Sequence, residues 1–129
     1  MSGANESPAN GSSGTGNGTV VIDDVAHAMA LNVTFSGLTG NVTASHIHCC
    51  TVVVNAGVAT STPTFSGFPS GVIFGSYSNT LDLTLASSYN ASYVTANGGT
   101  VASAEAALLA GNCCRESVLE HPQLSGRYW

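Results

Sequence analysis

The chain has 129 residues and a formal net charge of −5, and charged residues make up only 7% of it. Two basic residues against seven acidic ones argue against binding to nucleic acid or to an anionic membrane, since both need a basic surface. No run approaches the ~20 consecutive apolar residues of a membrane span. The length is sufficient for one domain with a hydrophobic core.

The first residues have neither the charged start nor the apolar stretch of a secretory signal peptide. A composition dominated by Asn, Ser, Thr and Gly is nevertheless typical of proteins outside the cytoplasm. We therefore expect a mature domain with an added Met1, and a location that is secreted, periplasmic or in the cell envelope.

The chain begins with a Gly-, Ser- and Asn-rich arm at residues 2–17. Residues 19–23 predict a strand, residues 24–28 a turn, and the alternating segment 29–36 the second strand of a hairpin. After a turn at 37–40, the strand expected next covers residues 42–51. A loop at 54–71 then leads to one or two further strands within residues 72–85.

Helical character appears late in the chain, at residues 87–96 and 103–110. For the second segment we expect Ser103 as the N-cap and Gly111 as the stop. Together the segments predict an all-β fold, an antiparallel β-sandwich of Greek-key or immunoglobulin-like type with one or two short helices near 87–111.

The segment Thr43–Cys50 holds two of the four histidines and two of the four cysteines. In a strand, His46 and His48 lie on one face and Ile47 on the other. Two imidazoles on one face can share a single divalent metal, for which we consider zinc, copper and calcium. The alternative is a pair of surface histidines or of buried, hydrogen-bonded histidines, because His-x-His alone is a weak signal.

A useful metal site needs a third ligand, and His121 is a candidate. An incomplete ligand set leaves open positions, as catalytic metal sites do, so a metal-bound water could attack an ester or lactone, or copper could change redox state. We expect His27 to be exposed in the hairpin turn, Glu6 to be a hydrogen-bond acceptor, and Asp82 to be a solvated charge on a strand. Asp23 and Asp24 are the remaining acidic residues that could offer oxygen ligands to a metal.

The cysteines form two vicinal pairs, Cys49–Cys50 and Cys113–Cys114. In an oxidising compartment, disulfides between the pairs would tie the histidine strand to the tail, and the sequence allows three pairings. Inert buried thiols, or Cys49 and Cys50 as soft metal ligands beside His48, are the alternatives. The chain contains no Gly-x-Ser-x-Gly, phosphate-binding or His-Glu-x-x-His motif.

Several segments match a known family in combination: SGANESP at 2–8, NVTFSGLTG at 32–40, ASHIH at 44–48, FSGFPSGV at 65–72, GSYS at 75–78 and AALLAG at 106–111. They resemble the CHRD domain, named from chordin and common in bacterial secreted proteins. The resemblance covers residues 1–112 as one domain and implies a β-sandwich. The His-x-His strand is also similar to the copper-ligand strand of copper–zinc superoxide dismutase, which would make the sandwich superoxide-dismutase-like.

The resemblance ends at an atypical tail, residues 113–129. CHRD domains usually finish with two more strands, the first ending in a histidine, whereas the segment from Cys113 to Leu124 has little strand character, and Arg115 to His121 could form a short helix broken at Pro122. With permitted codons, residues 115–124 can be read one base out of frame as Ala-Lys-Ala-Tyr-Leu-Asn-Ile-His-Ser, which is the family's segment. Our hypothesis is a frameshifted ending. The sheet edge left by the missing strands must be covered by the tail or by a second copy in a homodimer.

Two functions are consistent with the sequence. The first is a CHRD-type binding or structural module of the cell envelope or matrix, working through protein or glycan contacts. The second is a small metal-dependent enzyme that uses His46 and His48, either hydrolytic or dismutase-like. The low charge and the lack of an assured third ligand favour the binding module.

Overall fold

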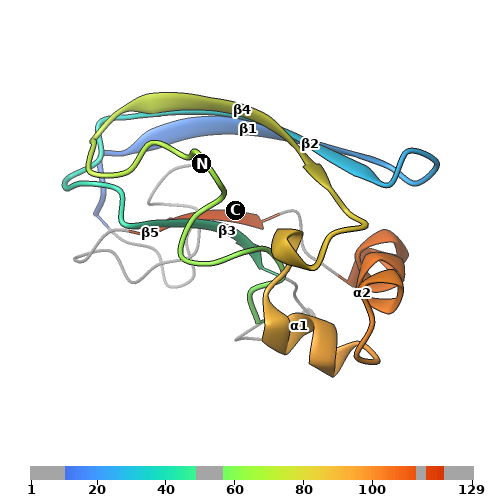
Figure 1. The fold of residues 1–129 in the computed structure, drawn as a ribbon. Coiled ribbons are helices and arrows are strands. Elements are labelled where there is room, and N and C mark those ends of the chain that lie inside the picture. The colour runs from blue at the N-terminus through green and yellow to red at the C-terminus, as the bar shows by residue number, and fades with distance from the viewer. Residues whose placement is uncertain (1–10, 49–56, 113–115, 121–129) are drawn as a thin grey trace.

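The computed structural model describes residues 11–48, 57–112 and 116–120. Two antiparallel sheets form its layers (Figure 1). Sheet A has the strand order β1-β2-β4, and sheet B pairs β3 with β5. The strands are β1 (Thr15–Asp23), β2 (Ala28–Ser36), β3 (Ala44–His48), β4 (Gly75–Asp82) and β5 (Glu116–Glu120). The expected all-β fold with a few short helices is confirmed.

Strand β2 follows the alternation that its sequence predicts. Met29, Leu31, Val33 and Phe35 are buried, while the residues between them face outward. Its neighbour β1 begins at Thr15, four residues before the predicted start at residue 19. The prediction began too late because Gly16 and Gly18 weaken the local strand signal. These glycines are paired with Phe35 and Val33 in the ladder, so backbone pairing to β2 supplies what local propensity lacks.

Strand β3 is bordered on both edges within the described residues. On one edge it pairs with β5 in the register His46↔Val118. On the other, Ala59 donates its N–H to the Ile47 carbonyl at 2.8 Å, and Ser45 donates to the Pro63 carbonyl at 2.9 Å. The loop after β3 therefore extends sheet B by local pairing.

The tail was expected to be helical, and this expectation is wrong for residues 116–120, which form β5. The edge of β3 presents unpaired backbone groups, and pairing with them outweighs the local preference of a short segment. The tail itself thus covers the edge, so the described structure does not need a second copy of the chain there.

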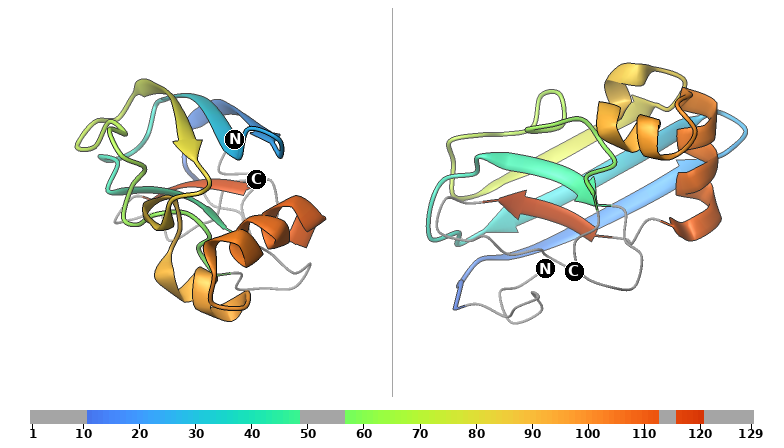
Figure 2. Two further views of the ribbon diagram at one scale, coloured as in Figure 1. Left: turned by 45° about the vertical axis from the view of Figure 1, so that its right-hand side comes forward. Right: turned by 90° about the horizontal axis from the view of Figure 1, so that it is seen from below.

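The helices lie at one end of the two sheets (Figure 2). They are η2 (Ala86–Ser88, a 3-10 turn), α1 (Ala91–Ala96), α2 (Val101–Ala107) and η3 (Leu108–Asn112, a π-helical turn). The N-cap of α2 is Thr100 rather than Ser103, since a capping box joins the two: the Thr100 side chain accepts from the Ser103 N–H. Gly111 is not the stop, because the π-helical turn continues to Asn112.

The core lies between the sheets and reaches the helices. Its aromatic part includes Phe35, Phe65, Phe68 and Tyr77, with the Phe68 and Tyr77 ring centroids 4.9 Å apart. Such aromatic pairs contribute about 0.5–1.5 kcal/mol beyond the burial of their area. Buried Tyr93 and Leu108 continue the core at the helical end, so helices and sheets share one hydrophobic interior.

Candidate functional site

His46 and His48 lie two positions apart on the same face of β3, and their side chains are in contact. Their Nε2 atoms lie 2.9 Å apart, and their rings are 4.7 Å apart between centroids. His46 and His48 are 4% and 8% exposed, whereas Ile47 belongs to the hydrophobic core. At this distance the N–H of one ring can donate a hydrogen bond to the bare nitrogen of the other.

The same spacing fits two ligands of one metal ion. Two nitrogens that each lie about 2.0–2.1 Å from one metal ion are roughly 2.9 Å apart at an angle of 90° and roughly 3.3 Å apart at the tetrahedral angle of zinc, so a zinc ion would need the two rings slightly further apart. Within residues 11–48, 57–112 and 116–120, no group of three or more His, Cys, Asp or Glu side chains could hold a metal. The candidate third ligand His121 lies outside the described residues, as do Glu6 and all four cysteines.

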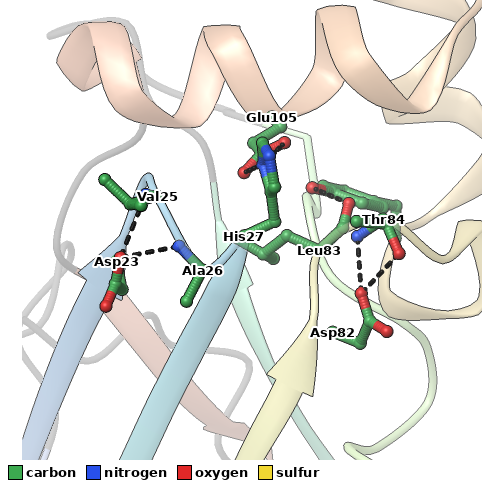
Figure 3. Close-up of polar contacts among 9 residues, drawn as sticks. Asp23, Val25, Ala26, His27, Asp82, Leu83, Thr84 and Glu105 are labelled. Carbon is green, nitrogen blue, oxygen red and sulfur yellow. Dashed lines mark hydrogen bonds and ion pairs between the residues drawn. The ribbon is translucent and has the colours of Figure 1, made fainter.

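His27, expected as a simply exposed turn residue, makes a specific tertiary contact (Figure 3). Its Nδ1 lies 2.9 and 3.0 Å from the two carboxylate oxygens of Glu105 in α2. The His27 side chain is 52% exposed and that of Glu105 only 9%. The hydrogen bond and charge of Glu105 raise the pKa of His27, and Asp24 and Asp82 contribute further in the same direction.

Two carboxylates near this contact, those of Asp23 and Asp82, accept hydrogen bonds from backbone N–H groups. Asp23 Oδ1 accepts from the N–H groups of Val25 and Ala26, at 3.0 and 2.8 Å, and so closes the hairpin turn. Asp82 Oδ1 accepts from the Thr84 N–H and hydroxyl, at 2.8 and 2.6 Å, which holds the pKa of Asp82 below its ordinary value (Figure 3). Both carboxylates are therefore hydrogen-bond acceptors in turns. Asp82, which was expected to be a solvated strand charge, is exposed but also accepts these two hydrogen bonds.

The outward side of sheet A carries a regular array of small polar groups, here called the polar face. The cross-strand pairs of the register define its rows, of which Thr19–Asn32–Ser78 and Asn17–Thr34–Ser76 are central. All six side chains are exposed. The rows on either side add Val21, Ala30 and Thr80, then Asp23, Ala28 and Asp82 at one end, and Thr15 and Ser36 at the other.

The polar face was not singled out from the sequence, although its residues are the polar half of the alternation in β2. In Figure 1, no described helix or strand covers it. The hydroxyl and amide groups of its two central rows all belong to exposed side chains. They therefore face solvent with their donors and acceptors available.

The described residues form a small two-layer antiparallel β-sandwich with helices at one end. The family model of the CHRD domain matches residues 1–113, and the chain belongs to this family. CHRD domains are typically extracellular, and membership supports an extracellular-type binding module in general. No curated protein and no solved structure is similar enough to match the chain. Within the described part, no helix is long and apolar enough to cross a membrane.

Proposed function

We propose that this chain is a secreted or envelope-associated binding module whose contact surface is the polar face of sheet A. The observation that carries the proposal is an exposed sheet face lined by hydroxyl and amide groups, with charge confined to Asp23 and Asp82 at one end. Solvated faces of antiparallel sheets are common. The proposal rests on the family's extracellular character together with this face.

The test is binding of the purified protein to envelope and extracellular-matrix fractions of the cells that carry its gene. A variant with bulky charges in the central row, Asn32→Lys/Ser78→Lys, should lose binding, because both positions face outward. A matched variant with charges elsewhere on the surface, Thr39→Lys/Ser87→Lys, should keep it. Equal binding by all three proteins, or none, would exclude the polar face as the contact surface.

A metal site at His46 and His48 is the second candidate, and the 2.9 Å separation of their Nε2 atoms favours it. Nitrogen donors suit zinc or copper better than calcium, which prefers oxygen. Both rings are buried, so an enclosed ion is favoured over one open to a substrate. Metal-dependent hydrolysis or dismutation would further require a third ligand and access to the ion.

Elemental analysis of untagged protein tests this second candidate. Near-stoichiometric zinc or copper should disappear in His46→Ala/His48→Ala and persist in His27→Asn, which removes an imidazole elsewhere. Metal that is retained by the double variant, or that is absent from all three proteins after incubation with zinc or copper, would count against the site.

A further inference from the structure

We propose that the polar face binds an uncharged polysaccharide; this inference rests on the proposed function and specifies its partner. The relevant features are the chemistry of the exposed groups, the absence of cationic side chains among the described residues, and the regular spacing of the rows. The charge and the side-chain size each argue against one class of partner, and all three features are compatible with a neutral glycan.

The charge of the described surface argues against polyanions. The chain has two Lys or Arg residues, Arg115 and Arg127, and neither lies in residues 11–48, 57–112 or 116–120. Nucleic acids, acidic glycans and anionic lipids need cationic contacts. Asp23 and Asp82 would repel them from the nearer end of the polar face, whereas an uncharged partner meets no such penalty.

The size of the side chains argues against a protein partner. Protein interfaces are usually anchored by buried aromatic or large apolar residues at their centre. The central rows of the polar face, Thr19–Asn32–Ser78 and Asn17–Thr34–Ser76, contain no such residue. Their hydroxyl and amide groups instead both donate and accept hydrogen bonds, as sugar hydroxyls do.

The spacing of the rows suits an extended chain of sugars. Neighbouring strands are about 4.8 Å apart, and side chains on one face recur about every 6.8 Å along a strand. The rows thus offer repeated hydrogen-bonding positions on the scale of successive pyranose rings.

The experiment is retention of the full chain on a panel of insoluble neutral polysaccharides: cellulose, chitin, β-1,3-glucan, xylan and mannan. Alginate serves as the anionic comparison. We expect retention on at least one neutral polymer, competition by its soluble oligosaccharides, and little change with added salt, because no ion pairs form. Retention on alginate alone, or strong weakening by salt, would overturn the proposal.

The decisive variant is Asn32→Ala/Thr34→Ala/Ser78→Ala, which removes hydrogen-bonding groups and leaves the backbone intact. Affinity should fall about tenfold or more. The matched control is Thr39→Ala/Ser70→Ala/Ser87→Ala, at exposed positions outside the polar face, and its affinity should stay within about twofold of the parent. Equal affinities of the two variants would contradict the assignment.

The outcome also separates this inference from the proposed function. If binding to envelope fractions depends on the polar face but disappears after the fractions are treated with protease, the binding module would be supported and a neutral polysaccharide partner would be refuted. Retention on neutral polymers that is insensitive to the central rows would refute the polar face in both proposals.

Discussion

The Nδ1 atom of His27 lies within 3.0 Å of both carboxylate oxygens of Glu105, a residue 78 positions later in the chain. The contact joins the tip of the β1–β2 hairpin to α2 (Figure 3). His27 holds a positive φ of 51°, which is uncommon outside glycine. Its carbonyl also accepts from the Leu83 N–H at 2.7 Å, so one turn residue fixes the hairpin against both β4 and the helices.

This contact predicts a stability that falls with rising pH. The pKa of His27 is raised above its ordinary value of 6.5 by Glu105, with Asp24 and Asp82 adding to it. Because the folded state holds this proton more tightly than the unfolded chain, the stabilisation is complete below about pH 6.5 and is lost as pH rises through the raised pKa. Urea unfolding at about pH 6 and pH 8.5 should show the decrease.

Two variants isolate the effect from the other histidines. His27→Asn suits the positive φ and cannot titrate in this range, while Glu105→Gln keeps the size of the partner and removes its charge. Each should flatten the pH dependence, and the coupling between them in a double-mutant cycle should shrink at high pH. If the free energy of unfolding of the parent and of both variants changed with pH in parallel, the contact between His27 and Glu105 would have no part in the pH dependence of stability.

Neighbouring residues of β2 should differ sharply in their effect on stability. Leu31 is 2% exposed in the core, so Leu31→Ala should lower the free energy of unfolding by about 2–5 kcal/mol. Asn32 faces outward, and Asn32→Ala should change it by less than about 0.5 kcal/mol. Chemical denaturation measures both values. A large loss for Asn32→Ala would mean that the polar face is part of the structural framework.

How far the sequence predicts the fold depends on whether the signal is local. The alternation of Met29 to Phe35 predicts β2 because one face of the strand is buried throughout. The sequence predicts the N-cap of α2 at Ser103 instead of Thr100, because both are good capping residues and only the reciprocal hydrogen bonds in the structure distinguish them. Strand β5 could not be predicted, since its stability comes from a partner strand far away in the chain.

The candidate site shows the same division. Strand alternation predicts that His46 and His48 share a face, and their Nε2 atoms do meet. The contact of His27 with Glu105 depends on tertiary packing between a turn and a helix, which no sequence period encodes. The polar face requires the register of β1, β2 and β4, because only that register aligns the Thr, Asn and Ser residues into rows.

The frameshift hypothesis has a direct test in the encoding DNA. Translation of the region for residues 115–124 in the other two frames should yield Ala-Lys-Ala-Tyr-Leu-Asn-Ile-His-Ser or a close variant. A chain carrying that ending should unfold at a higher temperature, because it restores the family's usual strands. Alternative frames without any such sequence would refute the hypothesis.

Pairing between β3 and β5 predicts a specific pattern of amide exchange. Ser45 donates its N–H to Pro63, and Ile47 donates its N–H to the Thr60 hydroxyl, at 2.9 and 2.8 Å. Since successive N–H groups of a strand point to opposite edges, those of His46 and His48 are directed toward β5. Val118→Pro removes the N–H opposite His46 in the register, and should speed hydrogen exchange at His46 and His48.

The amides of Ser45 and Ile47 provide the internal control, because their acceptors lie in the 57–65 segment rather than in β5. Ser117→Pro is the matched variant: its N–H is directed away from β3, where an edge strand tolerates proline. Nuclear magnetic resonance exchange rates should therefore separate the two substitutions. If Val118→Pro left His46 and His48 as protected as in the parent, β5 would contribute nothing to covering the edge of β3, and another segment would have to protect these amides.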